Sequence, residues 1–157
     1  MNPRKEFRTG RLLISAVAIT TAVGPFAADW NETHIHNPDW PPHAKFHNAQ
    51  TMSLGLSLAA TSLYHLWKRP TAGSPTREGL DTAAVCASLY WLTQISALAY
   101  PGSAAVDPPG TARFPQGKFA LPSLALVGLG YALERTRTRT RSRSVPHGPQ
   151  GWRVNQP

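Results

Sequence analysis

Four long stretches of the chain are largely apolar and contain no Asp, Glu, Lys or Arg, at residues 12–28, 46–67, 82–106 and 119–133. A helix on the surface of a soluble protein carries charged residues along its outer face, and these stretches have no such face. A hydrocarbon core about 30 Å thick requires roughly 20 helical residues, and fewer when flanking polar side chains reach the interface. The pattern therefore predicts four transmembrane helices, at residues 12–28, 49–67, 80–100 and 119–133.

The predicted fold is all-α, an integral membrane four-helix bundle formed by a chain of 157 residues. Small residues in the spans, such as Ala83, Gly128 and Gly130, suit close helix packing in lipid. We expect residues 1–134 to form the four-span transmembrane domain and residues 135–157, which begin with alternating Arg and Thr, to form a disordered basic tail. A soluble bundle with buried helices is the alternative.

The positive charges lie between the predicted spans. The chain has 16 Lys and Arg against 8 Asp and Glu, a net charge of +8. Most of the positive residues fall in segment 1–11, loop 68–79 and the tail, whereas loops 29–48 and 101–118 contain few. Cytoplasmic segments of membrane proteins are enriched in Lys and Arg. We therefore expect a multi-pass protein of the plasma (inner) membrane, with both termini cytoplasmic and the first and third loops external.

The Arg-rich tail is expected to fix this topology and to contact anionic lipid headgroups. Alternating Arg and Ser also occurs in RNA-binding arms. However, the tail directly follows a predicted span, and residues 135–144 contain no aromatic side chain for base stacking. We therefore expect the lipid bilayer as a partner, and no nucleic acid.

The first external loop concentrates the residues that can carry chemistry. Residues 29–47 contain four of the six His and three of the eight acidic residues. Asp39 is expected to cap a helix that begins at the two prolines after Trp40 and continues into the second span. This helix places His43 and His47, at positions i and i+4, on one face, which is a common metal-chelating arrangement.

This loop predicts a metal site. The expected ligands are His34, His43 and His47, with Asp29 as a further ligand or as a base beside the metal. Imidazole and carboxylate groups suit iron, copper, zinc or manganese, and the lack of thiolates argues against structural zinc. Haem is not expected, because His47 and His65 are 18 residues apart on one predicted helix, about 27 Å.

Further polar and aromatic residues can line a pocket at this site: Glu32, His36, Asp39 and Trp40 in the loop, Thr93 and Gln94 in the third span, and Asp107 in the third loop. Each has an ordinary structural alternative. Trp40 can anchor at the membrane interface, the two span residues can bond between helices, and Asp107 can belong to a turn.

Residues 30–47 follow the pattern W-N-x-T-H-x-x-N-P-x-W-P-P-H-A-x-F-H. This loop resembles the signature of a family of small four-helix membrane proteins of bacteria and fungi that has no established activity. The likeness covers roughly residues 10–134, excludes the tail, and implies the four-helix topology and the importance of the loop. Glu32, His36 and Asp39 fall at variable positions of the pattern. Carried over residue by residue, it implies functional roles for Asp29, Asn31, His34, His43 and His47.

These features predict a membrane-embedded enzyme. The first expectation is a metal-dependent oxidoreductase acting on a small lipophilic substrate, because a His-rich site without thiolates can hold iron or copper. The second is a metal-free isomerase or cyclase, in which the same histidines and carboxylates act as acids and bases. The third is a non-catalytic accessory or metal-handling membrane protein, for which we expect a homo-oligomer or a stable membrane partner.

Overall fold

The computed structural model describes residues 8–68, 76–106 and 110–143, and every regular element in these ranges is a helix. The elements are α1 (Thr9–Asp29), α2 (Pro42–Trp67), α3 (Thr76–Ser96), a short 3-10 helix η1 (Ala97–Ala99) and α4 (Gly117–Arg143). The all-helical fold with four long helices, predicted from the sequence, is therefore confirmed.

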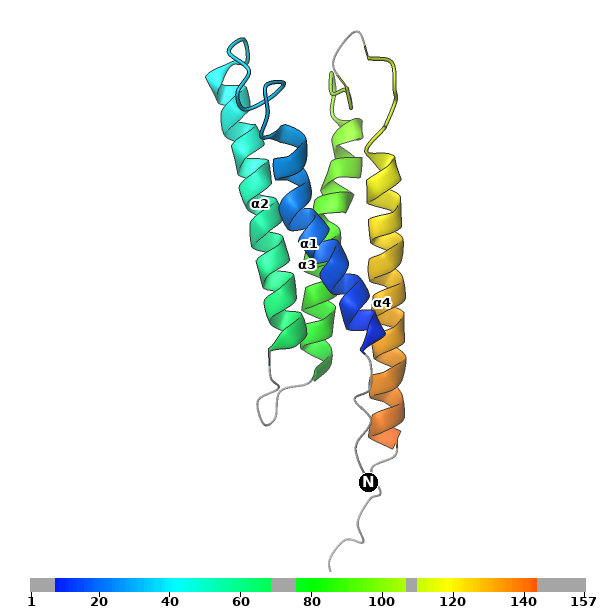
Figure 1. Cartoon of the computed structure of the whole chain (residues 1–157). Coiled ribbons are helices and arrows are strands. Elements are labelled where there is room, and N and C mark those ends of the chain that lie inside the picture. The colour runs from blue at the N-terminus through cyan, green and yellow to red at the C-terminus, as the bar shows by residue number, and fades with distance from the viewer. Residues whose placement is uncertain (1–7, 69–75, 107–109, 144–157) are drawn as a thin grey trace, which may run out of the picture.

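The four long helices form an antiparallel bundle (Figure 1). α1 packs against α2 and α4, and α3 packs against the same two helices. The α1–α2 loop and the α3–α4 connection lie at one end of the bundle, whereas the start of α1 and the end of α4 lie at the other end. The loop with the predicted site is thus held far from the Arg-rich end of α4.

The start of α2 differs from the prediction. Pro41 occupies the N-cap position, no side chain caps the helix, and Pro42 is its first residue. The predicted cap at Asp39 is therefore wrong. Asp39 instead donates its backbone N–H to Oδ1 of Asn37 at 2.9 Å, within the preceding turn. Proline is tolerated in the first turn of a helix because the backbone N–H that it lacks would have no intrahelical acceptor there. The helix α2 can therefore begin at the two prolines without a side-chain cap.

The end of α4 also differs from the prediction. The helix continues to Arg143, so residues 135–143 of the expected disordered tail are helical. Arg is a good helix former, and a nucleated helix extends at little cost. An ion pair of 3.8 Å between Glu134 and Arg137, one turn apart, supports this extension. The rest of the predicted tail, 144–157, lies outside the described residues.

Glycines set how closely the helices approach. A Cβ atom on Gly130 of α4 would lie 2.6 Å from the backbone oxygen of Gly10 in α1, and one on Gly55 of α2 would lie 2.8 Å from that of Thr21. These positions therefore require glycine. Gly128, expected at a helix interface, is different, because no described atom lies within 4 Å of a Cβ placed there. It faces open space between helices.

Large apolar side chains lie on the outside of the bundle as well as in its core. Each helix has at least one that is more than half exposed, namely Val23, Leu54, Val85 and Leu129. By length and composition, α1 and the segment Arg77–Ala99 can cross a membrane. A core helix of a soluble protein is mostly buried, whereas only 28% and 17% of these two apolar windows are buried in the bundle.

Arg11 of α1 contacts α2 and α4 at the end of the bundle opposite the α1–α2 loop. Its Nε lies 3.7 Å from Oε2 of Glu134 in α4, a side chain that is almost fully buried. One guanidinium N–H group donates to the backbone oxygen of Leu66 in α2, and the guanidinium lies 5.8 Å from the centroid of Trp67. The hydrogen bond to Leu66 satisfies a backbone carbonyl in the last turn of α2, where no intrahelical donor remains.

Gly128 and Gly130 of α4 predict opposite effects of the same substitution. Gly130→Ala places a methyl group against the backbone of α1, and overpacking of this kind costs about 1–3 kcal/mol. Gly128→Ala meets no atom and raises helix propensity, so we expect an unchanged or slightly higher stability. Thermal unfolding in detergent, followed by circular dichroism, measures both; equal midpoints for the two variants would contradict the close approach.

Candidate functional site

Asn31 organises the loop between α1 and α2. Its Nδ2 donates to the backbone oxygen of Ala28 at 2.6 Å, and its Oδ1 accepts from both the backbone N–H and the hydroxyl of Thr33, at 2.9 and 2.6 Å. The backbone N–H groups of His34 and His36 donate to the backbone oxygen of Asn31. An asparagine that bonds the chain two residues on favours a tight turn. Asn31 thus folds the loop over the end of α1.

Asp29 is the last residue of α1 and connects the loop to α2. Its Oδ2 accepts a hydrogen bond of 2.9 Å from Nδ2 of Asn48, in the second turn of α2. Its Oδ1 lies 3.8 Å from Nε2 of His34, a distance at which a protonated imidazole forms an ion pair. Tyr90 of α3 lies within electrostatic range of the same carboxylate. Side chains of the loop and of α2 therefore both approach the carboxylate of Asp29.

His34 is half-buried in the loop. Its Nδ1 lies 2.7 Å from the hydroxyl of Thr33, and its ring packs edge-on against Trp40 with centroids 4.8 Å apart. With Asp29 on one ring nitrogen and a hydroxyl on the other, the imidazole has a donor or acceptor on each side. These contacts fix the orientation of the ring and place its Nε2 toward the carboxylate of Asp29.

His43 and His47 form a second pair on the first turns of α2. Their Nε2 atoms are 3.1 Å apart, and both side chains are exposed. The prediction that they share one helix face is confirmed. Nδ1 of His47 lies 3.2 Å from Oε1 of Gln50, one turn further along. A metal-ligating His usually donates its other ring N–H to such an oxygen, which fixes the ring orientation.

The separation of the two Nε2 atoms fits one shared ion. With metal–nitrogen bonds of about 2.05 Å, a 3.1 Å separation corresponds to a ligand–metal–ligand angle of about 100°. This angle lies between the octahedral and tetrahedral values. By distance, the two imidazoles can thus supply two ligands to one metal ion.

The four predicted ligands fall into two pairs, Asp29 with His34 and His43 with His47. Within residues 8–68, 76–106 and 110–143, no three His, Cys, Asp or Glu side chains are arranged to hold one metal ion. The structure therefore separates a paired imidazole site from a carboxylate–imidazole pair. Asn48, next to His47 in the sequence, bonds Asp29 and links the two pairs through α2.

The residues predicted to line a pocket are placed differently from one another. Trp40 packs on His34, whereas Glu32, His36 and Asp39 are exposed. The hydroxyl of Thr93 donates to carbonyls of its own helix, whereas the structural alternative expected a bond between helices. The Oε1 atom of Gln94 is buried and has no hydrogen-bond partner among the described residues. Asp107 lies outside the described residues.

Two polar residues of α2 were not assigned a role from the sequence. Asn48 holds Asp29, and its own Oδ1 is buried without a partner in the described part of the chain. Gln50 supports His47. The spacing could have identified Gln50, because positions 43, 47 and 50 form one stripe along a helix. The role of Asn48 depends on how the loop folds, which spacing does not give.

Comparison with known proteins identifies a family. Residues 13–144 match the model of a "Family of unknown function (DUF6640)", and because this match covers most of the chain, the chain belongs to that family. No curated protein and no solved structure matches the chain.

The role of Asn31 predicts a local effect of its removal. Asn31→Ala deletes three side-chain hydrogen bonds of about 1 kcal/mol each, so the loop should open more easily by roughly 3 kcal/mol and exchange its amides about a hundredfold faster. Hydrogen–deuterium exchange of peptides covering 30–41 measures this. Glu32→Ala, at an exposed neighbouring position, is the control and should leave exchange unchanged. Equal exchange in both variants would contradict the assigned role.

Proposed function

We propose that this member of a family of unknown function is a small membrane-embedded, metal-dependent enzyme whose metal is held by His43 and His47. The observation that carries the proposal is the approach of the two Nε2 atoms to 3.1 Å, with Gln50 behind His47. Two imidazoles fill two positions of a four- to six-coordinate iron, copper, zinc or manganese ion. The remaining positions stay open to substrate or water.

In this proposal, Asp29 and His34 act as the proton-handling pair at the same end of the bundle as the metal. The carboxylate is fixed by Asn48, and the imidazole lies between that carboxylate and the Thr33 hydroxyl. The proposed reaction class is an oxidoreduction of a small lipophilic molecule, since imidazole ligands without thiolates suit iron and copper. Such a substrate reaches the site from the adjacent bilayer.

Four membrane spans, with the first and third loops external, complete the proposal. The apolar side chains on the outside of all four helices support it, because soluble monomers do not expose apolar surface on every side. The charge distribution supports this orientation in the membrane. The Arg-rich C-terminal end of α4 lies at the opposite end of the bundle from the histidine loop. The protein then belongs to the plasma (inner) membrane.

Two other functions are favoured by specific observations. The contacts of His34 with Asp29 and Thr33 favour a metal-free isomerase or cyclase that uses the pair as acid and base. The exposure of both His43 and His47 favours a metal-handling protein that passes an ion to a membrane partner. Metal content and its exchange with solvent separate these functions.

The metal proposal is tested by elemental analysis of protein purified in detergent without a His tag. We expect near-stoichiometric transition metal in the wild type and its loss from His43→Ala/His47→Ala, because two of its ligands are removed. His36→Ala is the matched control, as it removes an exposed histidine of the same loop and should retain the metal. A folded wild type that binds no metal after reconstitution would contradict the proposal and favour the acid–base alternative.

Site-directed labelling tests the proposed topology. In a Cys86→Ser background, a membrane-impermeant maleimide should label Thr111→Cys on intact cells, because residue 111 lies in the exposed α3–α4 connection. Arg137→Cys, near the end of α4, should be labelled only after the cells are opened. The reverse pattern would invert the topology, and recovery of the chain in the soluble fraction would contradict membrane insertion.

A further inference from the structure

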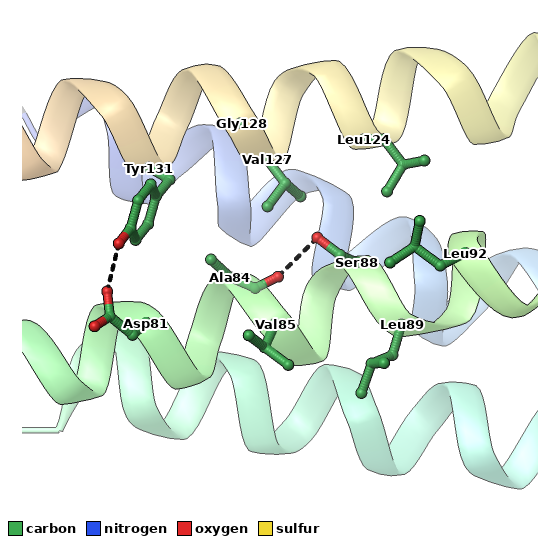
Figure 2. Close-up of a pocket in the computed structure, with 10 residues that line it drawn as sticks. All are labelled: Asp81, Ala84, Val85, Ser88, Leu89, Leu92, Leu124, Val127, Gly128 and Tyr131. Atoms are coloured by element: carbon green, nitrogen blue, oxygen red, sulfur yellow. Dashed lines mark hydrogen bonds between the residues drawn. The ribbon is translucent and has the colours of Figure 1, made fainter.

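A groove of about 420 Å³ runs between α3 and α4, away from the histidine site. Figure 2 shows Leu124 and Val127 pointing from α4 toward α3, and Leu92 pointing from α3 toward α4. The groove opens at Gly128, where a side chain would meet no described atom within 4 Å. Its walls are thus apolar, and its opening lies on the outside of the bundle.

The groove ends in a charged cluster. The hydroxyl of Tyr131 donates to Oδ1 of Asp81 at 2.7 Å (Figure 2). Arg135 donates to the same hydroxyl at 2.9 Å. Nε of Arg77 lies 3.8 Å from the other oxygen of Asp81, and both of these side chains are substantially exposed. Two guanidinium groups and one carboxylate leave a net charge of +1 at this end.

The dimensions of the groove match one leaflet of a bilayer. Its lining on α3 extends from Asp81 to Leu92, 11 residues apart or about 16 Å along the helix. Half of a hydrocarbon core is about 15 Å thick. The charged cluster therefore falls at the level of the headgroups when the apolar part lies at the level of the acyl chains.

We infer that this groove binds one anionic phospholipid of the cytoplasmic leaflet, with an acyl chain along α3 and α4 and its phosphate at Arg77 and Arg135. Charge complementarity identifies the occupant, because a positive cluster closes one end of an otherwise apolar slot. Arg can bind a phosphate through two parallel N–H groups. The inference rests on the membrane orientation in the proposed function and is independent of the metal.

Native mass spectrometry of the delipidated full chain tests this inference. Phosphatidylglycerol and phosphatidylcholine with identical acyl chains are the probes, and we expect the wild type to retain one phosphatidylglycerol in preference. Gly128→Leu fills the groove and should weaken binding about tenfold or more. Gly24→Leu is the matched control, since Gly24 of α1 has equally open space and lies outside the groove.

The charged end is tested separately. Arg135→Gln should reduce the preference for phosphatidylglycerol about fivefold, as one positive charge near the headgroup is lost. Arg113→Gln removes a charge at the opposite end of the bundle and should have no effect. Glycerol phosphate, which has the charge without acyl chains, should not be retained.

Several results would overturn the inference. Three of them are equal lipid binding by the two leucine variants, no preference between the two lipids, and retention of glycerol phosphate. The fourth is a wild-type dimer that dissociates in Gly128→Leu but not in Gly24→Leu, because this result would assign the groove to a second copy of the chain. Metal analysis of the same preparations separates the proposals. A wild type that retains the lipid but contains no metal contradicts only the proposed enzyme site. A wild type that contains the metal but retains no lipid contradicts only the lipid site.

Discussion

The hydrogen bond between Asn48 and Asp29 determines the shape of the loop-bearing end of the bundle. It joins the last residue of α1 to the second turn of α2, so the intervening residues must fold back within a short distance. The other oxygen of the same carboxylate faces His34. A single acidic side chain thus fixes both the path of the loop and the environment of its most enclosed histidine. The pair of histidines on α2 then stands beside this centre on a rigid helix.

The helices were predictable because the cause lies in the sequence itself. Long runs without charge leave no face for water, and their lengths set four helices near the observed positions. The common face of His43 and His47 follows from helical periodicity alone. Their separation from Asp29 and His34 did not follow, because it depends on turns made by Asn31 and Asn37 across short stretches of irregular chain.

Other features depended on tertiary contacts that no local pattern contains. Asp39 is a residue type that often caps helices, but its backbone N–H bonds the side chain of Asn37 in the preceding turn. Pro41 therefore occupies the N-cap position of α2. Gly128 and Gly130 are alike in sequence, yet one faces open space and the other faces the backbone of α1. The difference arises from two residues of helical rotation, about 200°, which turns neighbouring small residues to opposite sides.

The apolar part of α4 is short, and this has a consequence for the four-span arrangement that we propose. Residues 119–133 span about 22 Å as a helix, well below a typical core of about 30 Å, and the helix continues directly into Arg135 and Arg137. Hydrophobic mismatch of this kind is relieved by local thinning of the bilayer or by movement into a thinner one. In the proposed orientation, a membrane of uneven thickness therefore concentrates this protein in its thinnest regions.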